Sequence, residues 1–293
     1  MWKGGDSLSN IEVLVALGVL LASLADKFME AFYFGPSDRR LFGVYHPPAV
    51  ERPVPAAAVL CYPFLQEYLR SHRAFHRLAS LLTARGWHVL RFDYSGCGDS
   101  YDDSRPDAGA WRKDVQLACD ELRERAQTTR LALIGMRQGA SLAASVSYDT
   151  QPLSELVMWD PVIDGPTYRQ QLLAFRHAVT LSPGARRKLE RLHSGDRGVG
   201  LEFGPNVLEA IGRLDRTEQL KASADRILVL DSQRDESAVD FARRLDNLRP
   251  NVTLVRVSER GVWVERKRSD PRNISVPTVS LKAIVDWIGG TEG

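Results

Sequence analysis

Residues 131–147 read LALIGMRQGASLAASVS, and this stretch decides the fold. It begins with a short continuous apolar run, which is typical of a strand buried on both faces. It continues with a segment rich in alanine and serine that predicts a helix over residues 138–147. Gly135 and Gly139 flank the junction and permit a sharp turn with close packing of helix on strand. The stretch therefore predicts a strand, a tight turn centred on Arg137 and a helix.

Strands and helices alternate along the chain around this stretch. Short apolar runs predict strands at residues 56–61, 88–93, 156–159, 227–231 and 252–257. Helical spacing of apolar residues predicts helices at residues 71–84, 111–125, 238–248 and 279–288. A turn-rich segment between residues 31–34 and 41–45 predicts a hairpin before them. Such alternation is typical of a mostly parallel, doubly wound sheet with helices on both faces.

The alternation stops between residues 166 and 220, where the pattern favours helices and shows no convincing strand. A helical insertion late in a doubly wound sheet is typical of a cap over the carboxyl ends of the strands, where such folds bind ligands. We therefore expect an α/β domain at residues 31–293, a cap at about residues 165–222 and a helical extension at residues 1–30.

Composition excludes several classes of protein. The chain has 293 residues, of which 44% are hydrophobic and 26% charged, so it is neither collagen-like nor disordered. A net charge of +2 gives no reason to expect a nucleic-acid partner. Cys61, Cys97 and Cys119 lack C-x-x-C spacing, which argues against a zinc site or a disulfide framework. We expect a cytoplasmic protein with no metal and no cofactor.

The longest apolar run extends from Ile11 to Ala25 and is interrupted by Glu12. Fifteen residues are too few for a comfortable membrane span, and the run lacks the flanks of a signal peptide. We expect a buried or interfacial helix, with weak peripheral membrane contact as an open alternative.

The turn around Arg137 has the context of a nucleophile elbow, G-x-S-x-G, between a buried strand and a helix. The middle residue of such an elbow is held up into the pocket and attacks the substrate. Here it is Arg137, which stays protonated at any working pH and cannot attack a carbonyl. The sequence predicts the geometry of the elbow without its chemistry.

The other two positions of a catalytic triad follow in the order acid, then histidine. Asp235 is the best match for the acid, and Asp231 is the second choice. The histidine should come near residues 258–264, but the last histidine of the chain is His193. Two independent losses argue against a conventional Ser-His-Asp hydrolase.

Three other residues are expected at the pocket. Tyr62 and Phe64 follow the first central strand, where hydrolases place a loop that donates an oxyanion N–H, and Gln138 follows Arg137. Pro63 removes one backbone donor from that loop. Cys97 lies in a glycine-rich turn near the expected pocket rim. It is either a structural turn residue or an alternative nucleophile, which would need a neighbour that lowers its pKa.

With these motifs in place, the sequence resembles the exosortase A system-associated hydrolases. These are relatives of the serine aminopeptidase-like α/β-hydrolases and are found beside exopolysaccharide and protein-sorting genes. The resemblance covers the chain from about Leu41 to Trp287 and implies an α/β-hydrolase fold without supplying a substrate. The residues that carry it are Tyr62-Pro63-Phe64, Glu67, Arg73, Arg91-Phe92-Asp93, Gly96-Cys97-Gly98-Asp99-Ser100, Trp111, Gly135-x-Arg137-x-Gly139-Ala140, Trp159-Asp160-Pro161-Val162, Asp164-Gly165, Tyr168 and residues 204–211.

Two interpretations of Arg137 remain open. It is either a receptor for a small anionic or acyl ligand at a helix N-terminus, or the ion-pair partner of Asp235 or Asp231 in a closed pocket. Three functions follow. The first is a non-hydrolytic binding or accessory protein of a bacterial biosynthetic pathway. The second is an ester or thioester hydrolase, or an acyltransferase, that uses a different site. The third is a scaffold that docks to a pathway protein.

Overall fold

A computed structural model describes residues 29–64, 66–101, 108–149, 152–181, 209, 211–212, 216–259, 261–262 and 276–290. The apolar run from Ile11 to Ala25 lies outside these residues, as does most of the expected cap between residues 182 and 215. Among the described residues, no helix is both long and apolar enough to cross a membrane.

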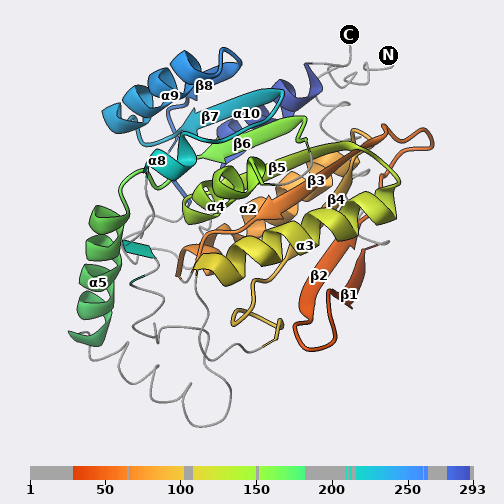
Figure 1. Cartoon of the computed structure of the whole chain (residues 1–293), viewed down its shortest axis with the longest axis horizontal. Helices are drawn as coiled ribbons and strands as arrows, with labels where there is room; N and C mark the ends of the chain where they lie inside the picture. The colour runs from red at the N-terminus through yellow and green to blue at the C-terminus, as the bar shows by residue number, and fades with distance from the viewer. Residues whose placement is uncertain are drawn as a thin grey trace, which may run out of the picture.

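One sheet of eight strands forms the centre of the molecule, in the order β1-β2-β4-β3-β5-β6-β7-β8 (Figure 1). The first two strands form the predicted hairpin, and β2 also runs antiparallel to β4. All remaining pairs are parallel. The strands are β1 (Glu30–Phe34), β2 (Leu41–His46), β3 (Ala56–Cys61), β4 (His88–Phe92), β5 (Arg130–Met136), β6 (Glu155–Trp159), β7 (Arg226–Asp231) and β8 (Val252–Arg256).

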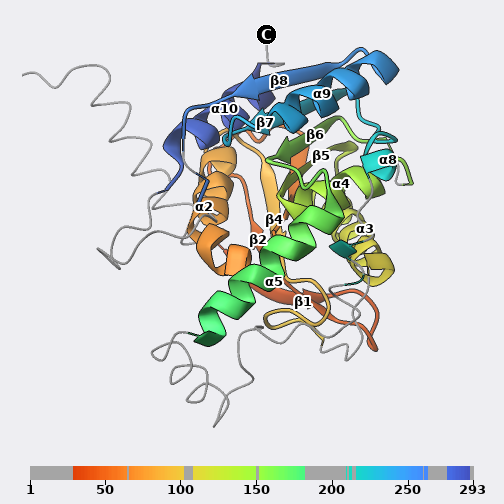
Figure 2. The same ribbon diagram turned by 90° about the vertical axis from the view of Figure 1, so that its left-hand side faces the viewer.

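The central strands are buried because helices cover both faces of the sheet. Helices α2 and α10 lie on one face, while α3, α4 and α9 lie on the other (Figures 1 and 2). Every residue of β3 is buried, as its unbroken apolar sequence predicts. The helices are α2 (Gln66–Thr83), α3 (Ala108–Ala126), α4 (Gln138–Ser147), α5 (Gly165–Leu181), α8 (Arg216–Gln219), α9 (Glu236–Leu248) and α10 (Thr278–Gly289).

This arrangement confirms the predicted doubly wound α/β class. Helix α5 begins at Gly165, where the alternation of strands and helices was expected to stop, and β7 resumes it at Arg226. In Figure 2 α5 lies on the side of the molecule where β5 ends and α4 begins. The carboxyl ends of the parallel strands therefore meet the first helix of the expected cap.

Candidate functional site

The elbow has the predicted geometry. Between β5 and α4, Arg137 adopts φ 54° and ψ −122°, a strained conformation for a residue that carries a Cβ. Two close approaches hold the turn. A Cβ at Gly135 would lie 2.4 Å from the carbonyl oxygen of Gly139, and one at Gly139 would lie 2.2 Å from the carbonyl oxygen of Cys61. Glycine is therefore required at both positions, and Arg137 occupies the place of the nucleophile.

The guanidinium of Arg137 pairs with Glu67, a residue in the first turn of α2. Its Nε lies 3.3 Å from Oε1 of Glu67. The other carboxylate oxygen accepts a 2.7 Å hydrogen bond from the hydroxyl of Tyr168, in the first turns of α5. The ring of Tyr168 also lies against the guanidinium, with its centroid 5.2 Å from Cζ. The sheet, α2 and α5 thus meet at one charged cluster.

The charged side chains of this cluster are largely buried, so water screens their interaction only weakly. The side chain of Arg137 is 15% exposed and that of Glu67 is 8% exposed. Burial is the largest single influence and lowers the pKa of Arg137, but Glu67, Tyr168 and Asp160 together outweigh it, so the pKa is raised overall. Burial and the charge of Glu67 both raise the pKa of Tyr168. Arg137 therefore stays charged and Tyr168 stays a neutral hydrogen-bond donor.

Asp160 is a second carboxylate at this edge of the sheet. It follows β6, adopts φ 44° and is buried. Its carboxylate accepts hydrogen bonds from the N–H and the hydroxyl of Ser232 at 2.7 and 2.8 Å. Its carbonyl oxygen accepts one from Nη1 of Arg137 at 3.4 Å. Burial raises the pKa of Asp160 to about 6, although Ser232 and Arg137 favour the charged form.

The two predicted acids have other partners. Asp231 is buried at the end of β7 and pairs with Arg256 of β8 at 3.1 Å. Asp235 is exposed and caps α9 by accepting the N–H of Ser237 at 2.8 Å. The expected pairing of Arg137 with Asp235 or Asp231 is therefore wrong. Glu67 takes that place because α2 starts beside the elbow.

In the segment where a catalytic histidine was expected, Glu259 caps the start of helix α10. The carboxylate of Glu259 accepts N–H hydrogen bonds from Val279 and Ser280 at the start of α10. It also accepts the hydroxyl of Ser280 at 2.8 Å. This cap satisfies donors that a helix start leaves unpaired. Residues 263–275 lie outside the described part of the chain.

Tyr62 and Phe64 are core residues rather than residues of an open pocket. Each is 2% exposed. Tyr62 stacks on Phe75, and its hydroxyl accepts a 3.1 Å hydrogen bond from buried Arg91. Phe64 packs against Trp111 with ring centroids 4.1 Å apart. Aromatic packing therefore turns both rings inward, and neither ring lines an open pocket. Their expected place at the oxyanion loop depends on the backbone and stays a prediction.

Gln138 remains a residue of the elbow, at the first position of α4. It is fully buried, and its side-chain amide has no hydrogen-bond partner among the described residues. Its backbone N–H belongs to the first turn of a helix, where no intrahelical acceptor is available. Gln138 thus keeps the position of an oxyanion donor beside a residue that cannot attack.

Cys97 lacks the surroundings of a reactive thiol. Burial raises its pKa to about 12, and the negative charges of Asp93 and Asp114 act in the same direction. A reactive thiol needs a neighbour that stabilises the thiolate. The structure supports the turn-residue interpretation, since Ser100 and Asp99 donate hydrogen bonds to Asp93 across this turn.

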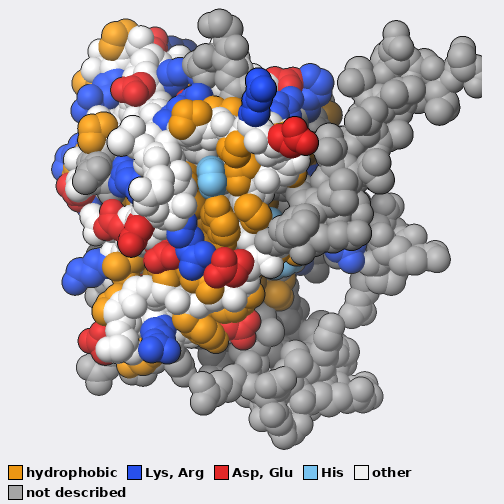
Figure 3. Space-filling model, turned by 90° about the vertical axis from the view of Figure 1, so that its right-hand side faces the viewer, with side chains coloured by type: hydrophobic (Ala, Val, Ile, Leu, Met, Phe, Trp, Pro, Cys, Tyr) orange, Lys and Arg blue, Asp and Glu red, His pale blue; other side chains and the backbone are white. Residues whose placement is uncertain are grey.

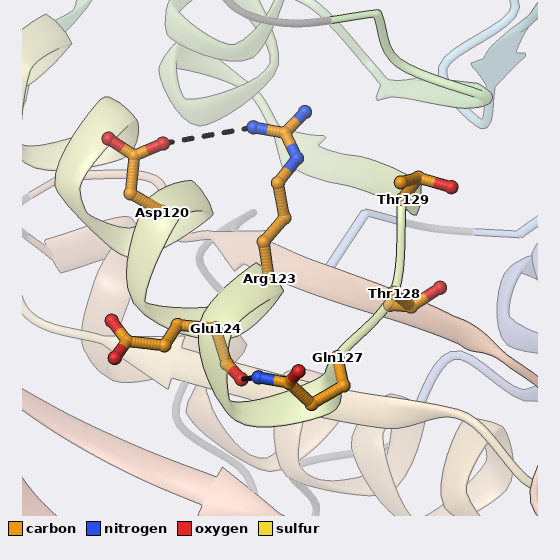
Figure 4. A pocket seen from close by; sticks show the side chains of 6 residues that line it. All are labelled: Asp120, Arg123, Glu124, Gln127, Thr128 and Thr129. Atoms are coloured by element: carbon orange, nitrogen blue, oxygen red, sulfur yellow. Dashed lines mark hydrogen bonds and ion pairs between the residues drawn. The ribbon is translucent and has the colours of Figure 1, made fainter.

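A surface pocket of about 410 Å³ lies at the other end of β5, between the end of α3 and the strand (Figure 4). It precedes Arg130, whereas Arg137 follows the last residue of the strand, so the pocket is separate from the elbow. Within the described residues, no group of three or more potential ligands is placed to hold a metal ion. The pocket is lined by Asp120, Arg123, Glu124, Gln127, Thr128 and Thr129.

Sequence reasoning missed three residues as members of the site. Glu67, Asp160 and Tyr168 appeared only as parts of a family pattern. The one available signal for Glu67 was a single acid at the start of a helix otherwise rich in arginine and histidine. That signal reads equally well as an interaction with the helix dipole.

Comparisons with known proteins agree with this geometry. Residues 64–259, about two thirds of the chain, match the family described as Serine aminopeptidase, S33. No curated protein sequence matches the chain significantly. The family match confirms the α/β-hydrolase fold.

Solved structures of several hydrolases share this fold at low identity. A soluble variant of monoglyceride lipase from Saccharomyces cerevisiae has a TM-score of 0.65 at 13% identity, over 89% of this chain and 95% of that one. An esterase from Pyrococcus furiosus has a TM-score of 0.62 at 16% identity, over 90% of each chain. Proline iminopeptidase from Mycobacterium smegmatis has a TM-score of 0.60 at 12% identity, over 89% of this chain and 98% of that one. The chain belongs to the serine aminopeptidase family of α/β-hydrolases, and Arg137 is the residue at the strained turn between its β5 and α4.

Proposed function

We propose that this chain is a non-hydrolytic accessory protein that keeps the hydrolase fold. The observation that carries the proposal is the buried cluster of Arg137, Glu67 and Tyr168 at the elbow. A guanidinium paired with a carboxylate offers neither a nucleophile nor a base. The sequence has no histidine after His193, so the usual general base is missing as well. The cluster holds the cap on α2 where a hydrolase would hold its substrate.

The geometry favours a closed ion pair over a vacant anion receptor. Glu67 already supplies a carboxylate to Arg137, and Tyr168 fixes the other oxygen of that carboxylate. A small anionic or acyl ligand would have to displace Glu67 and leave a buried charge without its partner, which is costly. Docking to another component of a pathway is therefore the better supported role. The resemblance to exosortase A system-associated hydrolases favours a bacterial biosynthetic pathway and a cytoplasmic location.

Ester or thioester chemistry at a different site has less support. The esterases and the lipase among the structural neighbours share only the fold at their level of identity. Cys97 was the alternative nucleophile, and its raised pKa keeps it a thiol at working pH.

A panel of acyl esters and thioesters tests the absence of hydrolysis. We expect no turnover above the uncatalysed rate for the wild type or for Cys97→Ala. Arg137→Ser should also stay inactive, because it restores a hydroxyl without a general base. Wild-type turnover that disappears in Cys97→Ala would instead establish the alternative function.

The change in melting temperature on adding small carboxylates or phosphate distinguishes the two interpretations of Arg137, an anion receptor and a closed ion pair with Glu67. A closed pair predicts no shift in the wild type and a positive shift in Glu67→Gln, whose Arg137 lacks its anion. A receptor predicts a shift in the wild type that is lost in Arg137→Ala. Arg244→Gln on α9 is a matched control, since Arg244 is exposed and its one ion pair among the described residues is with Asp240 of its own helix.

A further inference from the structure

Polar atoms in the interior of a protein need hydrogen-bond partners, whereas exposed ones are served by solvent. Over the face shown in Figure 3, charged side chains are interspersed with apolar ones and lie at the surface. A buried amide without a partner is destabilising by the cost of its desolvation. Among the described residues, two amides near the elbow have such atoms, on Gln138 and Gln219.

The amide of Gln138 makes no hydrogen bond to any described residue. Gln138 is fully buried at the first position of α4, and both its Oε1 and its Nε2 lack a partner. Gln219, at the end of α8, is 1% exposed. Its Nε2 donates a 2.7 Å hydrogen bond to the carbonyl oxygen of Val162, but no described residue donates to its Oε1. Two acceptor oxygens and one donor nitrogen are thus left over.

Both glutamines face the junction of α4 with α8. Gln138, Ser141 and Tyr148 recur at helical spacing and so lie on one side of α4. On that side the hydroxyl of Tyr148 donates a 2.8 Å hydrogen bond to Glu218 of α8. The hydroxyl of Ser141 donates a 3.0 Å hydrogen bond to the carbonyl oxygen of Val162, which the second glutamine also binds. Figures 1 and 2 both show α8 beside α4, so the two amides meet at one buried junction.

We propose that one water molecule bridges Gln138 and Gln219. The amides do not bond to each other, because each would then have a partner. A water between them donates to both Oε1 atoms and accepts from Nε2 of Gln138, which gives the three hydrogen bonds typical of buried water. The bridge joins the start of the elbow helix to α8, the last helix before β7. It does not depend on the function proposed for the elbow.

Charged occupants fit these atoms poorly. An anion would meet two acceptor oxygens, which repel it, and only one donor. A cation would meet the hydrogens of Nε2 of Gln138 and would bring a charge into the interior at high cost. Water supplies two donors and an acceptor without any charge. The site therefore differs from an anion receptor at Arg137.

Gln138→Met tests the bridge by the sign of its effect. Methionine has about the length of glutamine but no amide, so it cannot hold the water. If the bridge exists, Oε1 of Gln219 loses its donor, and we expect the melting temperature to fall by about 3–5 °C. If the amide has no partner, its removal relieves an unpaired polar group and the melting temperature should rise. A rise would overturn the proposal.

A matched control and a double variant complete this test. Gln170→Met on α5 changes an exposed glutamine and should alter the melting temperature by less than about 1 °C. The double variant Gln138→Met/Gln219→Met shows whether one water serves both amides. Its loss should be smaller than the losses of the two single variants added together. Strict additivity would mean that the amides have separate surroundings and would refute the shared bridge.

Nuclear magnetic resonance detects the water directly. In the isotope-labelled full chain, the side-chain amide protons of Gln138 are the pair of signals that Gln138→Met removes. We expect a nuclear Overhauser cross-peak from these protons at the water frequency, and we expect it to weaken in Gln219→Met. The absence of this cross-peak in the wild type would contradict the bridge, as would a cross-peak that is unchanged in Gln219→Met.

Discussion

The carboxylate of Glu67 lies 3.3 Å from the guanidinium of Arg137, across 70 residues of sequence. This contact joins the first turn of α2 to the turn between β5 and α4. With Tyr168 on the other carboxylate oxygen, it also fixes the start of α5. The place where a hydrolase separates charge during catalysis is occupied by a permanent pair of charges.

Removing Glu67 should destabilise the protein strongly. In Glu67→Ala the guanidinium of Arg137 loses its buried anion, and we expect the free energy of unfolding to fall by about 2–3 kcal/mol. Tyr168→Phe removes one hydrogen bond and should cost about 1 kcal/mol. Denaturant unfolding measures both. Arg244→Gln, which breaks an exposed pair with Asp240, should cost less than about 0.5 kcal/mol.

A double-mutant cycle isolates the pair itself. If Glu67 and Arg137 interact as the structure shows, the double alanine variant should lose less stability than the two single variants added together. Strict additivity would mean that the two residues do not interact.

Substitution of Gly139 should prevent stable folding. A methyl group there would lie 2.2 and 2.4 Å from the carbonyl oxygens of Cys61 and Tyr62, which belong to the backbone and cannot move aside. We expect Gly139→Ala to cost about 3 kcal/mol or more. Gly290→Ala is the control, because its Cβ would meet its nearest neighbours at 3.5 and 3.6 Å. Thermal melts should show a large loss for the first variant and little change for the second.

His46 should make stability depend on pH. Its Nε2 accepts a 2.8 Å hydrogen bond from Arg91, and burial followed by the charge of Arg91 lowers its pKa from 6.5 to about 3. In the unfolded chain His46 is therefore protonated below about pH 6.5, whereas in the folded protein it is protonated only below about pH 3. This contribution to stability is lost as pH falls through that window, at up to about 1.4 kcal/mol per pH unit.

Comparison with His46→Gln isolates this effect. Asp160, whose pKa is raised to about 6, acts in the opposite direction but is common to both proteins. Unfolding measured between pH 7 and 4.5 should show the wild type losing about 2–3 kcal/mol relative to the variant. A constant difference across that range would show that His46 titrates normally.

Cys97 should react slowly with alkylating reagents. With its pKa raised to about 12, only a minute fraction is thiolate at pH 7.5, so iodoacetamide labelling should be more than about 100-fold slower than for glutathione. Mass spectrometry of each site gives the rates, and the rate at Cys97 should rise about tenfold per pH unit. Labelling at the rate of a free thiol would restore Cys97 as a nucleophile.

The sequence predicted the elbow well because its determinants are local. Gly135 and Gly139 lie within five residues of each other, and the apolar strand before them admits few arrangements. The chain order of strands also located Asp231 at the end of β7. These predictions depended on periodicity and on spacing, which are properties of the chain itself.

The partner of Arg137 could not be predicted in the same way. Choosing among Glu67, Asp231 and Asp235 depends on α2 starting beside the elbow and on β8 presenting Arg256 to Asp231, which are properties of the packed protein. Tyr62 shows the same limit. Its place after β3 predicted a residue at the pocket. The direction of its ring depends on packing, and the ring points into the core, where it stacks on Phe75.

The pairing of Asp231 with Arg256 has a consequence for how this lineage could change. Asp231 links the last two strands of the sheet, so reassigning it to orient a histidine would remove one of the two carboxylates that pair with Arg256, the other being Glu236. Restoring serine at position 137 would likewise leave Glu67 without its cation. Under the proposed non-hydrolytic function, a Ser-His-Asp site could be built from this sequence only by several simultaneous substitutions, because the groups it would use already hold one another in place.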